Sequence, residues 1–125
     1  MSYPKTMDDT QDEIGEWAQS KGWWDADKLD SAPKIDGRNS LEICALIGSE
    51  VSEAVEEARL GRMATEFVAD KNGIMKPEGF YSELADVVIR IMDTCAQAGV
   101  SLYDEIQIKM EYNHLREHRH GGKLA

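Results

Sequence analysis

Residues 46–59 read LIGSEVSEAVEEAR, and residues 83–90 read ELADVVIR. Each stretch carries two acidic residues three positions apart, among apolar residues that recur with helical period. These acidic residues are Glu50 and Glu53 in the first stretch, and Glu83 and Asp86 in the second. Because an α-helix has about 3.6 residues per turn, positions i and i+3 lie on one face with Cβ atoms about 5–6 Å apart. Each stretch therefore predicts two neighbouring carboxylates on one helix face.

Two such helices packed side by side would bring all four carboxylates to one place. Buried charges of one sign cost several kcal/mol each unless cations compensate them. Carboxylate oxygens without histidine suit Mg²⁺ first and Mn²⁺ as a substitute, whereas di-iron bundles add Glu-x-x-His pairs that neither stretch contains. The pattern predicts a magnesium site, and the alternative is a helix face held by salt bridges, because ion-pair networks also gather charges.

The length and charge of the chain limit its domain organisation and its partners. With 125 residues, of which 42% are hydrophobic, residues 1–125 suit a single domain. The net charge of −10 argues against binding to a nucleic acid polymer, which needs clustered Lys and Arg. A small phosphorylated ligand stays possible, because bound divalent cations invert the local charge of an acidic site.

The cysteines and the hydropathy pattern indicate the cellular compartment. Cys44 and Cys95 lie among apolar residues without CxxC spacing, so we expect two reduced thiols in the core. The first ten residues contain no signal-like apolar run, and no stretch approaches the roughly 18 apolar residues of a membrane span. We expect a cytoplasmic protein that does not insert into membranes.

Helix-capping residues and apolar periodicity predict an all-α fold. The predicted helices cover residues 8–21, about 40–60, about 80–98 and 101–118. Residues 22–38 are expected to form a connecting loop. Residues 62–78, a weak helical stretch followed by turn-rich sequence, are expected to form a mobile loop. No segment shows the alternation of a convincing β-strand.

The second and third predicted helices both have unusual faces. The second is apolar on two sides, which indicates burial by a neighbouring helix or a second subunit. Its main stripe comprises Leu41, Cys44, Ala45, Gly48, Val51, Val55 and Ala58. The third helix is apolar nearly all round, and its single polar stripe holds Glu83, Asp86, Arg90 and Asp93. A buried charge persists only with a partner, so this stripe predicts a bound cation.

The fourth predicted helix carries Lys109, Asn113 and Arg116 on one face. Lys, Asn and Arg side chains are suitable donors to phosphate oxygens. If this face lies opposite the acidic cluster, a triphosphate fits between them. A bound Mg²⁺ would lower the pKa of a water molecule, which then serves as the nucleophile of an in-line displacement.

Four segments in this order resemble the MazG-like nucleoside triphosphate pyrophosphohydrolases. They are Leu46–Arg59, Lys76–Phe80, Glu83–Arg90 and Lys109–Lys123, and the resemblance covers roughly residues 41–123. It implies a four-helix bundle of antiparallel helices that assembles as a dimer or tetramer. The implied reaction is Mg²⁺-dependent hydrolysis between the α- and β-phosphates, which yields a nucleoside monophosphate and pyrophosphate and clears unwanted nucleotides.

The resemblance also implies roles for individual residues. The metal ligands would be Glu50, Glu53, Glu83 and Asp86, and the phosphates would be held by Lys109 and Asn113. Among these, we assign catalysis to Glu53 as the proton acceptor, to Glu50 and to Lys109.

Other residues have two readings. Arg116 is a phosphate contact or a salt-bridge partner. The aromatic residues Trp23, Trp24 and Phe80 contact the nucleotide or belong to the core, and we place Trp24 and Phe80 in the substrate site. Glu57 is an auxiliary ligand or solvated, and Arg90, one turn beyond Asp86, forms a structural ion pair. The alternative function is a non-catalytic helical interaction module whose carboxylate cluster is structural.

Overall fold

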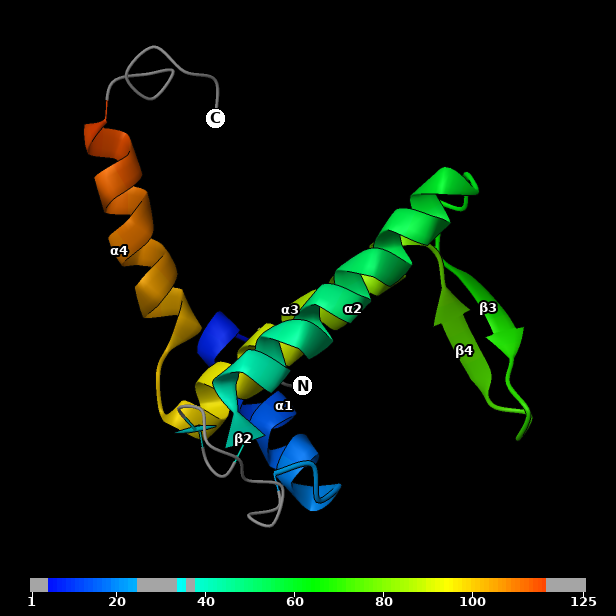
Figure 1. Cartoon of the computed structure of the whole chain (residues 1–125), viewed down its shortest axis with the longest axis horizontal. Helices are drawn as coiled ribbons and strands as arrows, with labels where there is room; N and C mark the ends of the chain where they lie inside the picture. Colours follow the sequence, from blue (N-terminus) through cyan, green and yellow to red (C-terminus); the bar gives the residue numbers. More distant parts are fainter. Residues whose placement is uncertain (1–4, 25–33, 36–37, 117–125) are drawn as a thin grey trace.

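The computed structural model describes residues 5–24, 34–35 and 38–116, and these residues form a mostly helical structure (Figure 1). The helices are α1 (Met7–Ser20), α2 (Ser40–Arg59), α3 (Phe80–Ala98) and α4 (Leu102–Leu115). Short strands β1 (Lys34–Ile35), β2 (Arg38–Asn39), β3 (Glu66–Ala69) and β4 (Met75–Glu78) form two antiparallel pairs. The predicted helices are confirmed, except that residues 117–118 lie outside the described part. Within that part, no helix combines the length and apolar character that crossing a membrane requires.

Side-chain caps explain where the helices begin. The Thr6 hydroxyl accepts a hydrogen bond from the backbone N–H of Asp9, and the Asp9 carboxylate accepts one from the N–H of Thr6. Asn39 caps α2 and Ser101 caps α4 in the same manner, each with a side-chain oxygen. These bonds satisfy N–H groups that have no partner inside a helix.

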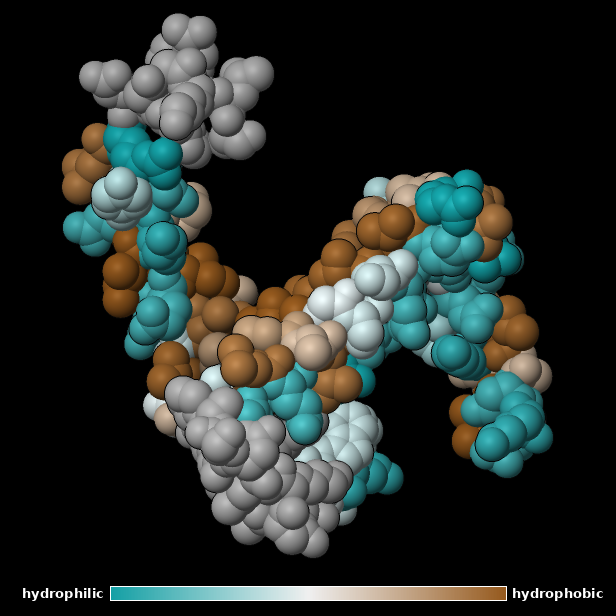
Figure 2. Space-filling view, in the orientation of Figure 1, coloured by the Kyte–Doolittle hydropathy of each residue, from teal (hydrophilic) through white to brown (hydrophobic). Residues whose placement is uncertain are grey.

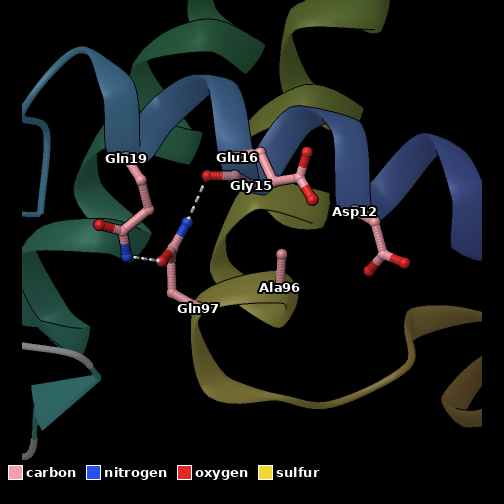
Figure 3. Close-up of a pocket in the computed structure, with 6 residues that line it drawn as sticks. All are labelled: Asp12, Gly15, Glu16, Gln19, Ala96 and Gln97. Atoms are coloured by element: carbon pink, nitrogen blue, oxygen red, sulfur yellow. Dashed lines mark hydrogen bonds between the residues drawn. The ribbon is translucent and has the colours of Figure 1, made fainter.

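A close approach at Gly15 and Ala96 packs α1 against α3 (Figure 3). A Cβ atom added to Gly15 would lie 2.5 Å from the Cβ atom of Ala96, so only glycine fits. Gln97 Nε2 donates to the carbonyl oxygen of Gly15 at 3.0 Å, and Gln19 donates to Gln97 Oε1. This contact and the adjoining core of Ala18, Trp24 and Ile43 fix α1 on the other two long helices.

Helices α2 and α3 pack together through faces that are partly acidic. Glu57 and Glu83 are buried in this packing, whereas most of the main apolar stripe expected on α2 is exposed. Leu41, for example, is 69% exposed. The prediction that Cys44 is a core thiol is wrong for the single chain, because Cys44 lies on that exposed stripe.

A β-hairpin occupies much of residues 62–78, so the prediction of a weak helical stretch and a loop without strands is wrong for this segment. Strands β3 and β4 pair antiparallel, with Glu66 opposite Glu78. Gly73 adopts a φ of 80°, and Asp70 Oδ1 accepts hydrogen bonds from the N–H groups of Asn72 and Ile74. The Asp70 N–H also donates to the Ile74 carbonyl oxygen at 2.8 Å, so residues 71–73 form a three-residue loop, and such a loop with glycine in the left-handed region is a common hairpin connection. Nearly every strand residue is exposed, so no alternation marked the strands.

Helix α4 leaves the body formed by α1, α2 and α3 and runs apart from α2 (Figure 1). Its start is fixed to α1, because Gln11 accepts from the N–H of Leu102 and donates to the carbonyl oxygen of Val100. None of its own residues is buried within the described part of the chain, and Leu115 is 80% exposed. The far half of α4 therefore has no cover from the described residues.

Candidate metal centre

Three carboxylates from two helices converge between α2 and α3. Glu50 lies on α2, and Glu83 and Asp86 lie one turn apart on α3. One oxygen of each carboxylate lies within 4.8 Å of the others. Glu53, the next acidic residue along α2, lies within hydrogen-bonding reach of Glu83. The structure thus brings together the four carboxylates that the sequence pattern selected.

Glu83 is the most unfavourably placed of the four. It is 9% exposed, and among the described residues its buried Oε2 atom has no hydrogen-bond partner. Burial, the carboxyl group of Glu53 and the charges of Asp86, Glu53 and Glu50 raise the pKa of Glu83 to about 7. Because two carboxylates bond to each other only when one holds a proton, Glu83 needs either a proton or a cation.

Asp86 experiences the same negative surroundings. Burial, followed by the charges of Glu50 and Glu53, raises the pKa of the Asp86 carboxyl. Arg90 and Lys76 act in the opposite direction. The net result indicates that these two cations do not fully compensate the acidic cluster.

Arg90 pairs across the helix interface. Its Nε atom donates to Glu50 Oε1 at 2.8 Å, so the ion pair expected for Arg90 exists, with Glu50 on α2 as the hydrogen-bonded partner. Glu57 is buried and accepts from Arg62 Nε at 2.7 Å. This bond engages the Glu57 carboxylate and leaves it outside the group of converging oxygens.

The donor set fits a hard divalent cation. The converging atoms are carboxylate oxygens, and one of the residues that supply them, Glu83, also has a buried oxygen without a hydrogen bond to any described residue. Mg²⁺ is held in proteins by one or a few carboxylates and completes its octahedral coordination with water or substrate phosphates. Such an ion would satisfy Glu83 Oε2 and oppose the repulsion among the acids.

The predicted phosphate-binding residues of α4 are not at this cluster within the single chain. Lys109 and Arg116 lie beside the ring of Tyr112, at 5.9 and 5.4 Å from its centroid. Asn113 lies on the same helix, which departs from α2 (Figure 1).

Two of the aromatic residues considered as nucleotide contacts, Trp24 and Phe80, also lie elsewhere. Trp24 is buried in the core, where its Nε1 donates to both carboxylate oxygens of Asp93 at 3.0–3.1 Å. Phe80 is half-buried at the start of α3 and contacts the Tyr81 ring edge-on.

Three other residues lie near the carboxylates: the sequence offered a nucleotide contact as one alternative for Trp23, and it assigned no role to Lys76 or Trp17. Lys76 on β4 is close enough to act on the charge of Asp86. Trp17 and Trp23 line a cavity whose wall also includes Glu50 and Asp86. Lys76 belongs to the Lys76–Phe80 segment, which was a usable signal, whereas nothing in the sequence around Trp17 distinguishes it from a core residue.

Comparisons of the chain with protein-family models, with curated proteins and with solved structures found no match.

Proposed function

We propose that this protein is a MazG-like, Mg²⁺-dependent nucleoside triphosphate pyrophosphohydrolase that hydrolyses the bond between the α- and β-phosphates. The observation that carries the proposal is the buried Glu83 oxygen, which has no hydrogen bond to a described residue although Glu83 belongs to a group of converging carboxylates. A protein tolerates this arrangement where a cation binds. Oxygen-only ligands favour Mg²⁺, with Mn²⁺ as a substitute, and Mg²⁺ commonly binds together with phosphates.

The residues of the site have separate roles in this proposal. Glu50, Glu83 and Asp86 hold Mg²⁺, with Glu53 at the edge of the cluster. The bound ion supplies charge neutralisation and a water molecule of lowered pKa. Glu53, which is exposed, accepts the proton of the attacking water. Attack on the α–β anhydride breaks one P–O bond and yields the nucleoside monophosphate and pyrophosphate.

Lys76 is the phosphate contact that the same chain can supply. Its side chain is largely exposed on β4, and its charge reaches Asp86. A lysine ammonium group beside the metal site can pair with the terminal phosphates. Lys76 therefore takes the place in the single chain that the sequence pattern gave to Lys109.

We propose that the functional unit is a homodimer or homotetramer that completes an antiparallel four-helix bundle. Apolar side chains are exposed along α2 and on α4, on either side of the angle between these helices (Figure 2). On α2 they include Val51 and Val55, and Leu84 and Val88 of α3 are also exposed. A contiguous apolar surface of this kind marks an interface.

The assembly would also explain the position of α4. A second copy packed on α2 can bring its own α4, with Lys109, Asn113 and Arg116, to the triphosphate. The partners are then a nucleoside triphosphate and further copies of the chain. The net charge of −10 disfavours a nucleic acid polymer, and a house-cleaning role in the cytoplasm suits such an enzyme.

A panel of deoxynucleoside and nucleoside triphosphates tests the activity. With Mg²⁺ we expect equimolar monophosphate and pyrophosphate, resolved by ion-exchange chromatography, and no turnover in Glu53→Gln. Glu56→Gln is the matched control, because Glu56 lies on the same helix and pairs with Arg59 on the surface. Absence of turnover on every nucleotide with both Mg²⁺ and Mn²⁺ would refute the assignment.

The second candidate is a non-catalytic helical interaction module, which the exposed apolar faces of α2 and α4 favour. It predicts that Mg²⁺ with a non-hydrolysable triphosphate leaves the melting temperature unchanged. A ligand that binds only the folded state must raise this temperature. A rise that is lost in a Glu50→Gln, Glu83→Gln double variant excludes this candidate.

A further inference from the structure

A cavity of about 180 Å³ lies directly beside the carboxylate cluster. Two of its lining residues, Glu50 and Asp86, belong to the cluster, and the others are Trp17, Trp23, Ile89 and Arg90. It differs from the cavity in Figure 3, which lies between α1 and the end of α3 and contains none of the predicted metal ligands. A ligand held by the carboxylates therefore has an aromatic-walled space next to it.

The two tryptophan rings form one wall of this cavity. Their centroids lie 4.7 Å apart in an edge-to-face arrangement. Trp23 packs against the core, and its N–H bonds to the carbonyl oxygen of Ala18, so its position is fixed. Trp17 is 45% exposed although it is a large aromatic residue. Exposed aromatic surface inside a pocket is typical of sites that stack planar rings.

Arg90 adds hydrogen-bond donors to the same cavity. Its Nε atom is engaged with Glu50, and no bond from its two terminal nitrogens to any described residue is formed. A guanidinium group has only donors and pairs with carbonyl oxygens of nucleobases, as in arginine contacts to guanine. A ring that offers carbonyl acceptors suits this position better than one that offers an amino group.

We propose that this cavity binds the nucleobase of the substrate, with the base stacked on Trp17, the nearly perpendicular ring of Trp23 at its edge, and a ring carbonyl accepting from Arg90. The inference rests on the proposed function, because it places the triphosphate at the neighbouring carboxylates. Bases with a carbonyl group next to a ring nitrogen, as in guanine, thymine, uracil and cytosine, are the preferred class, and adenine, which has no carbonyl group, is disfavoured. Trp17, Trp23 and Arg90 thereby determine specificity and take no part in the bond cleavage.

Calorimetric titration with Mg²⁺ tests the stacking. The titrants are a non-hydrolysable dGTP analogue and inorganic tripolyphosphate, which lacks the base. Stacking on an aromatic ring is worth about 5- to 150-fold in affinity. We expect a loss in this range for the nucleotide in Trp17→Ala and Trp23→Leu, with tripolyphosphate binding unchanged. Tyr103→Ala is the matched control, because Tyr103 is also 45% exposed and lies on α4 outside the cavity.

The outcomes separate the two proposals. Equal affinity of the wild-type protein for tripolyphosphate and for the nucleotide overturns the base pocket and leaves the metal–phosphate site intact. A nucleotide affinity that is unchanged in Trp17→Ala also overturns the base pocket. Because Trp17 is exposed, this variant keeps the test valid even if Trp23→Leu unfolds. Binding of neither titrant with Mg²⁺ overturns the proposed function together with the pocket.

A comparison of bases tests Arg90. We expect the dGTP analogue to bind more tightly than the dATP analogue, and Arg90→Gln to reduce this ratio. The ratio is the proper readout, because any effect of losing the bond to Glu50 on the metal site acts on both nucleotides. A ratio unchanged by the substitution contradicts the role of Arg90.

Discussion

At the scale of single residues, the carboxyl group of Glu83 forms few favourable interactions with its surroundings. It is buried among other acids, and the structure offers its Oε2 atom no donor from the described residues. Such a group lowers the stability of the metal-free protein. Functional sites commonly hold groups of this kind, with pKa values displaced by burial and like charges.

The pKa of Glu83 predicts how stability depends on pH without metal. Its value of about 7 in the folded protein exceeds the ordinary 4.5, so between these values the folded state binds more protons than the unfolded state. The free energy of unfolding should therefore fall as the pH rises from about 4.5 to about 7. Urea unfolding in EDTA measures this slope.

Glu83→Gln should flatten the dependence, and Glu16→Gln, on the surface of α1, should retain it. Added Mg²⁺ should stabilise the wild-type protein more at pH 8 than at pH 5, because the ion competes with the proton. Identical slopes for the wild-type protein and Glu83→Gln would contradict this account of the site.

Lys76→Gln should weaken triphosphate binding without unfolding the protein. A hydrogen bond to a charged group is worth about 1.5–3 kcal/mol, so the dissociation constant should rise about tenfold or more. The exposed side chain should contribute little to stability, about 0–1 kcal/mol. Titration with tripolyphosphate and Mg²⁺ measures the effect. Lys71→Gln, in the turn of the same hairpin, is the control. An equal loss of tripolyphosphate affinity in both variants would show that Lys76 has no specific role in binding.

At the scale of helices, the contact between α1 and α3 depends on Gly15. Gly15→Ala places a methyl group 2.5 Å from Ala96 Cβ, and overpacking of this kind costs about 1–3 kcal/mol. Urea unfolding should show the loss. Adding Ala96→Gly should make the double variant more stable than the sum of the two single effects predicts. A Gly15→Ala protein as stable as the wild type would show that the helices do not approach this closely.

The helices could be predicted from the sequence, whereas the hairpin could not. Asn39, Ser101 and Gly99 mark helix ends through local hydrogen bonds and backbone conformation, which depend on few neighbours. The hairpin residues have neither face covered, so hydrophobic alternation gave no signal for β3 and β4. Only Asn72-Gly73 marked the turn.

The carboxylate cluster was predictable in part for a similar reason. The spacing of Glu83 and Asp86 places them on one face of α3 independently of how the rest of the chain packs. Arg90 lies on the same helix, so periodicity places it on that face too, whereas the positions of Lys76 and Trp17 depend on how distant segments pack, which periodicity does not encode.

At the scale of the whole molecule, periodicity identified an apolar stripe on α2 without showing what covers it. The described part of the chain leaves that stripe exposed, together with much of α4. Apolar faces of this extent rarely stay in contact with water in a monomer. Lys109 belongs to α4, which runs apart from α2 in the single chain (Figure 1).

Charged substitutions on α2 test this interpretation. We expect the wild-type protein to sediment as a dimer or tetramer, and Val51→Asp with Val55→Asp to sediment as a monomer, because association would bury the new charges. Met7→Asp, at the exposed start of α1, should leave the assembly unchanged. A wild-type protein that is monomeric at all concentrations would refute the shared bundle.

The central claim is that carboxylates from α2 and α3 bind a divalent cation. Electron paramagnetic resonance of Mn²⁺ tests it most directly, because the signal of free Mn²⁺ falls when the ion binds. We predict saturable binding to the wild-type protein, competition by Mg²⁺ and loss of binding in Glu83→Gln, with Glu16→Gln unaffected. Equal Mn²⁺ binding by the wild-type protein and Glu83→Gln, or none by either, would contradict the claim.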